Sequence, residues 1–300
     1  MKKLLTIVMV LLASLAQARE TVTIIYAWSP ADAAANFHRQ LVQESNRIQD
    51  RFTFVFDTRP GAGGSIAANH VLNNPNHILA TASAFYIRPN FFPTESHDLT
   101  RFRGLFPACA APAVISSKKY RSWADVPANT RLTIGMSGLG TTTHLIAHQL
   151  LKRYPQIVIV PYKSTSDALM AVLNDSTDFS VNFLGDSAQY LEGRARVYQL
   201  GITGNQTVNG VQPLSQQGFP RDLELMNVVA QLAIPTTMSD SRVQELREIF
   251  LRAGKTTAVA EAYKVDYCSS INQMPSAEVQ PWYVRQVADW KRLTQGVNLQ

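Results

Sequence analysis

Short apolar runs rich in β-branched and aromatic residues alternate with helical patterns along the first third of the chain. The runs at residues 21–26, 52–56 and 77–82 predict strands. Apolar residues spaced three and four positions apart predict helices at 31–47 and 65–72. This strand–helix–strand order predicts a parallel sheet with helices packed on its faces.

The same alternation restarts after residue 111. Further strands are predicted at residues 112–116, 132–136, 157–162, 179–183 and 197–202, and helices at 144–153 and 166–174. An apolar stretch from 225 to 234 is followed by predicted helices at 239–253 and 276–295. We therefore expect an α/β protein with two units, each presenting the carboxyl ends of its strands to a ligand cleft.

Composition is that of an ordinary globular protein. The 300 residues are 46% apolar and 17% charged, which suits about two domains. The 28 Lys and Arg residues exceed the 22 Asp and Glu residues, for a formal net charge of +6, but they are scattered. Dedicated nucleic-acid binding is therefore not expected.

The first 18 residues have the pattern of a secretory signal peptide. Lys2 and Lys3 precede an apolar run at residues 4–15, and Ala16-Gln17-Ala18 fits a cleavage site. The alternative, a membrane anchor, needs roughly 20 apolar residues, and this run is shorter. No cysteine lies near the site to carry a lipid. We expect export to the periplasm of a Gram-negative cell.

The chain has two cysteines, Cys109 and Cys268. In an oxidising compartment they could pair as a disulfide, or they could remain two isolated buried thiols. Their spacing matches no zinc or redox motif.

Two glycine-rich turns each follow a predicted strand and open a predicted helix. Residues 135–143 contain Gly138 and Gly140 and add the hydroxyl groups of Ser137 and Thr141. Unpaired N–H groups at a helix N-terminus favour an anion, so this turn is a candidate anion site, the alternative being a tight turn with a threonine cap. Residues 59–65 form the second turn, either another anion nest or a structural turn.

Other candidate chemistry is weaker. His144 and His148 have the spacing of a metal pair, but the Glu of H-E-x-x-H is missing and no third ligand is evident. We interpret them as packing or capping residues and expect no metal and no cofactor. Ser137 and Ser187 are candidate nucleophiles of a hydrolase, although neither lies in a G-x-S-x-G motif.

Four segments, taken together, resemble the substrate-binding proteins of tripartite tricarboxylate transporters, the TctC or Bug family. They occur in the family's order across nearly the whole chain after residue 18. The segments are Thr58-Arg59-Pro60-Gly61-Ala62-Gly63-Gly64, Gly135-Met136-Ser137-Gly138-Leu139-Gly140-Thr141-Thr142-Thr143-His144-Leu145, Val160-Pro161-Tyr162-Lys163 and Gly193-Arg194-Ala195-Arg196.

The resemblance implies a two-lobed periplasmic-binding-protein fold of type II, with parallel or mixed sheets flanked by helices and a hinge between the lobes. It also implies that the C-terminal segment returns to the first lobe. We accordingly assign residues 1–18 to the signal peptide, 19–107 and 230–300 to lobe 1, and 108–229 to lobe 2.

The resemblance further implies that a loop of each lobe binds the ligand through backbone N–H groups. We expect residues 59–64 to support their lobe as the family's structural signature. Carried onto this chain, the expected ligand-binding residues are Trp28, Ser29, Pro30, Ala31, Ser83, Ala84, Ser137, Gly138, Thr141, Thr142, Thr143, Tyr162, Asn182 and Asp186.

This chain departs from the family where glycines are usual after the first strand. Ala31-Asp32-Ala33 stands there instead, so Asp32 either repels a ligand carboxylate or caps the following helix. The identity of the ligand is therefore less transferable than the fold.

We expect a monomeric solute-binding protein, not an enzyme, that captures a small organic anion and serves membrane transporter subunits. Two alternatives remain open, an exported serine hydrolase and a ligand-sensing protein that retains the binding fold.

Overall fold

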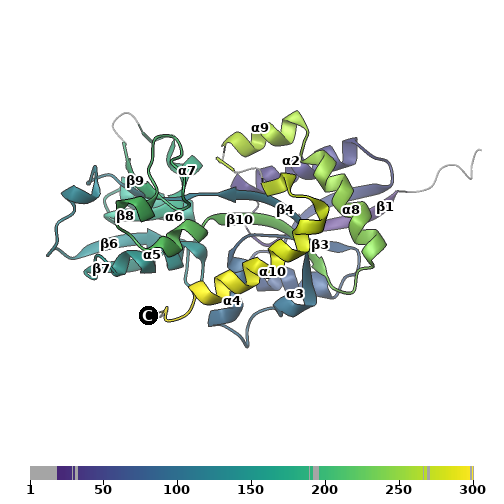
Figure 1. Ribbon diagram of the computed structural model, residues 1–300, viewed down its shortest axis with the longest axis horizontal. Helices are drawn as coiled ribbons and strands as arrows, with labels where there is room; N and C mark the ends of the chain where they lie inside the picture. Colours follow the sequence, from purple (N-terminus) through teal and green to yellow (C-terminus); the bar gives the residue numbers. More distant parts are fainter. Residues whose placement is uncertain are drawn as a thin grey trace, which may run out of the picture.

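In the computed structural model, two five-stranded sheets lie side by side (Figure 1). The structure describes residues 19–28, 30, 33–188, 190–191, 196–265, 267–268, 271–297 and 299. The first sheet has the strand order β2-β1-β3-β10-β4 and the second the order β7-β6-β8-β5-β9. We call the first sheet with its helices lobe 1 and the second sheet with its helices lobe 2.

Lobe 1 is built from both ends of the chain. Strands β1, β2 and β3 are parallel, as the alternating pattern predicted, whereas β10 runs antiparallel to its neighbours β3 and β4. The sheet is therefore mixed. The strands are β1 (Glu20–Tyr26), β2 (Phe52–Thr58), β3 (His77–Thr81), β4 (Phe102–Ala111) and β10 (Val228–Pro235).

Helices cover both faces of this sheet, because successive side chains of a strand point to opposite faces. On β1, Ile24 joins one apolar cluster and Ile25 the other. Helices α2, α8 and α9 supply the first cluster and α3, α4 and α10 the second. These helices are α2 (Ala33–Arg47), α3 (Ser65–Leu72), α4 (Ala84–Phe91), α8 (Asp240–Ala253), α9 (Thr257–Val265) and α10 (Ser276–Leu293).

Lobe 2 is made by the central part of the chain. Strand β6 pairs in parallel with β7 and β8, and β5 pairs antiparallel with β8 and β9. Its elements are β5 (Ala113–Ser117), β6 (Leu132–Met136), α5 (Thr142–Leu151), β7 (Ile157–Pro161), α6 (Thr165–Leu173), β8 (Phe179–Phe183), α7 (Leu184–Ala188) and β9 (Tyr198–Ile202).

The chain passes between the sheets along β4 and β10. The predicted lobe boundaries, at 107/108 and 229/230, fall inside these two strands, and the division at those residues stays a prediction. Strand β4 contains Pro107, which has no N–H for a sheet ladder, and the β4–β10 register shifts beside it.

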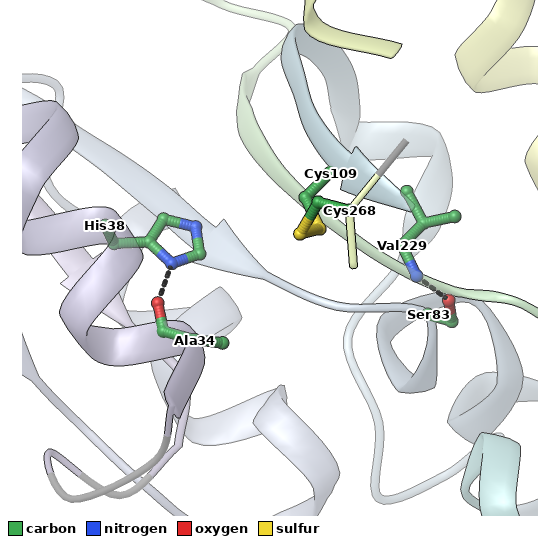
Figure 2. The surroundings of a disulfide bond; sticks show 6 residues. All are labelled: Ala34, His38, Ser83, Cys109, Val229 and Cys268. Atoms are coloured by element: carbon green, nitrogen blue, oxygen red, sulfur yellow. Dashed lines mark hydrogen bonds between the residues drawn. A yellow bond between two sulfur atoms is a disulfide. The ribbon is translucent and has the colours of Figure 1, made fainter. Parts of the chain in front are cut away.

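A disulfide joins Cys109 of β4 to Cys268, which follows α9 (Figure 2). The two Cα atoms are 5.2 Å apart and the residues are 159 positions apart in sequence. Of the two states left open by the sequence, the structure has the paired one.

Buried histidines should make the stability of the fold pH dependent. Burial lowers the pKa of His38, His97 and His144 to about 4, from an ordinary value of 6.5. Between pH 6.5 and 4 the unfolded chain binds protons that the folded chain does not. The free energy of unfolding therefore falls as the pH drops through this window, by up to about 1.4 kcal/mol per pH unit for each histidine.

Replacing His38 by phenylalanine should reduce that pH dependence. His38 packs against Tyr26 and Phe37, contacts that a phenylalanine ring retains. The free energy of unfolding of His38→Phe should fall less steeply with decreasing pH than that of the wild type, by up to about 1.4 kcal/mol per pH unit. Urea unfolding from pH 7.5 to 4.5 measures this slope. An unchanged slope would contradict a depressed pKa at this site.

Candidate functional site

The loop between β6 and α5 turns sharply onto the N-terminus of the helix. Gly138 and Gly140 have φ of 91° and 69°, in the left-handed region that favours glycine. Thr141 caps α5, and its Oγ1 accepts a hydrogen bond from the backbone N–H of His144 at 3.3 Å. The glycine-rich turn thus leads into a capped helix, as the sequence predicted.

Three hydroxyl groups of this loop bond to one another. Thr143 Oγ1 lies 2.9 Å from Ser137 Oγ and 3.0 Å from Thr141 Oγ1, and Thr141 Oγ1 donates to the Gly138 carbonyl at 2.8 Å. The hydroxyl proton of Thr141 is used in the bond to that carbonyl, so Thr141 must accept in its contact with Thr143. Thr143 is then the donor to Thr141, and Ser137 is the donor to Thr143. The hydroxyl protons are then used inside the loop and fix its shape.

The donors left for an anion are backbone groups. The first-turn N–H groups of a helix have no intrahelical acceptor, and here the threonine cap takes that of His144. The N–H groups of Thr142 and Thr143 remain at the positive end of the dipole of a ten-residue helix. This arrangement favours a carboxylate or a similar anion.

The predicted ligand loop of lobe 1 follows β1, and its Trp28 contacts the other glycine-rich turn. A Cβ added to Gly64, which has φ of 93°, would lie 2.9 Å from the ring of Trp28, so only glycine admits this ring. Arg39 of α2 donates to the Pro30 carbonyl at 2.8 Å. Ser29 and Ala31, with Asp32, lie outside the described residues.

Ser83 and Ala84, at the start of α4, are both buried. Ser83 Oγ accepts a hydrogen bond from the Val229 backbone N–H at 2.8 Å (Figure 2). The same hydroxyl donates to the Asn227 carbonyl at 3.3 Å. The hydroxyl therefore ties α4 to the start of β10.

Ser83→Ala should destabilise the fold. It leaves the buried N–H of Val229 without this acceptor, which costs about 1–3 kcal/mol. Urea unfolding measures the loss, with Ser166→Ala, an exposed position of α6, as a control expected to change little. Unaltered stability together with a large loss of ligand affinity would instead show that Ser83 serves the ligand.

In lobe 2, three further predicted residues lie at or beyond the carboxyl ends of β7 and β8. The Tyr162 N–H donates to the Met136 carbonyl at 2.8 Å, which places this residue beside the glycine-rich loop. Asn182 is fully buried and donates to the Phe183 carbonyl at 2.8 Å. Asp186 accepts from Thr165 Oγ1 at 3.2 Å, and burial raises its pKa.

The lobes touch where the end of α4 meets the glycine-rich loop. A Cβ added to Gly140 would lie 3.0 Å from the ring of Phe92, and Phe91 stands edge-on to His144 with ring centroids 6.3 Å apart. This contact was not predicted, because α4 itself was not predicted from the sequence. An apolar run from Ala84 to Ile87 was its one signal, and Pro89 masked it.

The serines considered as nucleophiles have other partners. Ser137 Oγ bonds to Thr143, and the buried Ser187 Oγ accepts from Gln199 at 2.7 Å. Neither hydroxyl contacts a histidine within the described ranges. The described residues also contain no group of three His, Cys, Asp or Glu side chains placed to hold a metal ion.

No protein-family profile and no curated protein matches the sequence. Solved structures do match the fold. A TctC solute binding protein from Polaromonas is 16% identical with a TM-score of 0.70, covering 94% of this chain and all of that one. Rpa4515 of R. palustris with adipate is 17% identical with a TM-score of 0.77, covering 93% and 97%.

MatC from Rhodopseudomonas palustris with bound malate is 15% identical with a TM-score of 0.77, covering 92% of this chain and 99% of that one. At these identities the match establishes the fold. The predicted two-lobed periplasmic-binding-protein architecture is confirmed, and it is the fold of TctC and Bug solute-binding proteins.

Proposed function

We propose that this chain is a periplasmic solute-binding protein that captures a small carboxylate between its two lobes and delivers it to membrane transporter subunits. The observation that carries the proposal is the capped N-terminus of α5. There, Ser137, Thr141 and Thr143 bond among themselves and leave the N–H groups of Thr142 and Thr143 to an anion. Two proteins of the same fold have adipate and malate bound.

Binding requires the lobes to act together. The loop after β1 supplies the lobe 1 side, and Gly64 supports its Trp28. A ligand that contacts both lobes stabilises the arrangement in which they are close, and hinge motion about β4 and β10 would admit and release it. No catalytic residue is required, and the chain acts as a monomer.

The location follows from the predicted signal peptide, residues 1–18, which lies outside the described residues. Among the described residues no helix has the length and apolar character needed to cross a bilayer. Cell fractionation of the full-length chain would place it, and capture of membrane subunits would separate transport from a purely sensory role.

Thermal-shift screening against mono-, di- and tricarboxylates tests the proposal. A ligand present at 100 times its Kd stabilises the folded state by about 2.7 kcal/mol, which raises Tm by several degrees. We expect at least one dicarboxylate to do so, with calorimetry giving one site per chain. Failure of every carboxylate, or labelling of a serine by a fluorophosphonate, would refute the proposal.

A further inference from the structure

Two consecutive residues after α9 pack into different lobes. Cys268 is bonded to Cys109 of β4 and lies against the lobe 1 cluster formed by β1, α2 and α8. Tyr267 lies against a separate cluster that belongs entirely to lobe 2. This segment therefore contacts lobe 2 through Tyr267, while the disulfide of Cys268 attaches it to β4, an edge strand of the lobe 1 sheet.

The surface that receives Tyr267 is apolar and lies where the chain enters and leaves lobe 2. We call it the lobe 2 socket, and it consists of Val114, Leu184, Ile202 and Val211, with Val208 beside them. Val114 lies in β5, the first strand of lobe 2, and Ile202 ends β9, the last strand before the chain returns. The socket is thus adjacent to the hinge and to α7, which carries Asp186.

The backbone holds Tyr267 in an uncommon conformation. Its φ is 53°, in the left-handed region that bulky side chains seldom adopt. The N–H of Tyr267 donates to the Lys264 carbonyl at 3.2 Å, and that of Cys268 to the Tyr263 carbonyl at 3.0 Å. These two bonds are those of a Schellman cap, in which the residue after a helix adopts the left-handed conformation, so the end of α9 fixes the direction of the Tyr267 side chain.

Helix α9 connects this turn to the ligand loop of lobe 1. Tyr263 of α9 packs on Phe37 of α2, with ring centroids 4.5 Å apart, and α2 begins directly after the loop containing Trp28 and Pro30. Tyr267 thus links the helix behind one ligand loop to the lobe that carries the other.

We propose that Tyr267 is a positioning residue, a strut anchored by the Cys109–Cys268 disulfide that fixes the spacing of the two lobes and so of the two ligand loops. It adds a side-chain contact to the crossing strands β4 and β10 and to the contact of Phe92 with the glycine-rich loop. The strut narrows the range of lobe arrangements before ligand arrives. Its effect on affinity rests on the proposed function, whereas its effect on lobe spacing does not.

Distance measurement without ligand tests the strut independently of any ligand. Spin-label amino acids incorporated genetically at Met170 of α6 and Glu248 of α8, both exposed, would report the interlobe distance by double electron–electron resonance and leave the disulfide intact. We expect Tyr267→Ala to broaden the distance distribution severalfold. We expect Tyr267→Phe, which retains the ring, to match the wild type.

A control separates the strut from ordinary loss of packing. Tyr190 also lies against an apolar cluster, Leu169, Val172 and Val197, but that cluster lies wholly in lobe 2. Tyr190→Ala should lower Tm and leave the interlobe distance unchanged. If Tyr267→Ala fails to fold, Val211→Ala in the socket should broaden the distribution in the same way.

The outcomes distinguish the strut from the binding function. Broadening in Tyr267→Ala with no carboxylate bound by the wild type would support the strut and refute the proposed function. A distribution identical to the wild type in both Tyr267→Ala and Val211→Ala would overturn the strut, whatever the ligand. Where a carboxylate binds, Tyr267→Ala should weaken it about tenfold and Tyr267→Phe less than twofold.

Discussion

Replacing Cys109 and Cys268 together by alanine is expected to lower the free energy of unfolding by about 2–5 kcal/mol. The disulfide joins residues 159 positions apart and so closes a loop that contains the whole of lobe 2 and the returning strand β10. In the loop-entropy description, long loops gain the most from closure because the unfolded chain loses the most freedom. The bond also holds the segment after α9 against β4.

Urea unfolding with and without dithiothreitol measures this contribution. The reductant should lower the unfolding midpoint of the wild type and leave that of the double-alanine variant unchanged. Non-reducing peptide mapping gives the pairing itself. A wild type that unfolds at the same urea concentration in both conditions would show that the bond contributes nothing measurable.

Gly138→Ala is expected to weaken carboxylate binding by about 10- to 100-fold. The change forces an alanine into φ of 91° and so displaces the loop that presents the α5 N-terminus. A Cβ at this position would meet protein atoms only at 4.0 Å, so the fold itself has room for it. Loss of one or two hydrogen bonds to a charged group corresponds to this range of affinity.

A glycine that contacts the other end of α5 supplies the control. Gly218 has φ of 82° and lies beside Arg153, beyond the last residue of α5, whereas Gly138 precedes its first. Helix α5 has ten residues and is about 15 Å long, and the two glycines contact opposite ends of it. Gly218→Ala should carry a similar backbone strain and leave Kd unchanged, as calorimetry would show. Equal losses of affinity in the two variants would mean that the Gly138 loop is not the binding site.

Local pattern was enough to predict most of the regular elements. Strand β6 begins and ends where its apolar run does, because Arg131 and Ser137 bound that run. Strand β8 also matches its predicted range, although α7 begins directly after it at Leu184. Strand β4 was not predicted because it contains Pro107, and a proline inside an apolar run argues against a strand. Helix α4 was not predicted because it contains Pro89, and helix α9 was not predicted either.

The candidate site could be predicted in part. The glycine and threonine spacing predicted a turn onto a helix N-terminus, and this is how Gly138 and Thr141 are arranged. The order of the hydroxyl bonds and the contact of Phe92 with Gly140 depend on side-chain positions that no spacing encodes. The Cys109–Cys268 pairing depends on a fold that brings α9 back to β4.

A crystal structure of the chain with the carboxylate that stabilises it most would test the central claim most directly. We predict a carboxylate oxygen within about 3 Å of the backbone N–H of Thr142 or Thr143, with the rest of the ligand against the loop that begins at Trp28. A carboxylate bound at any other place, with the α5 N-terminus facing only water, would contradict it.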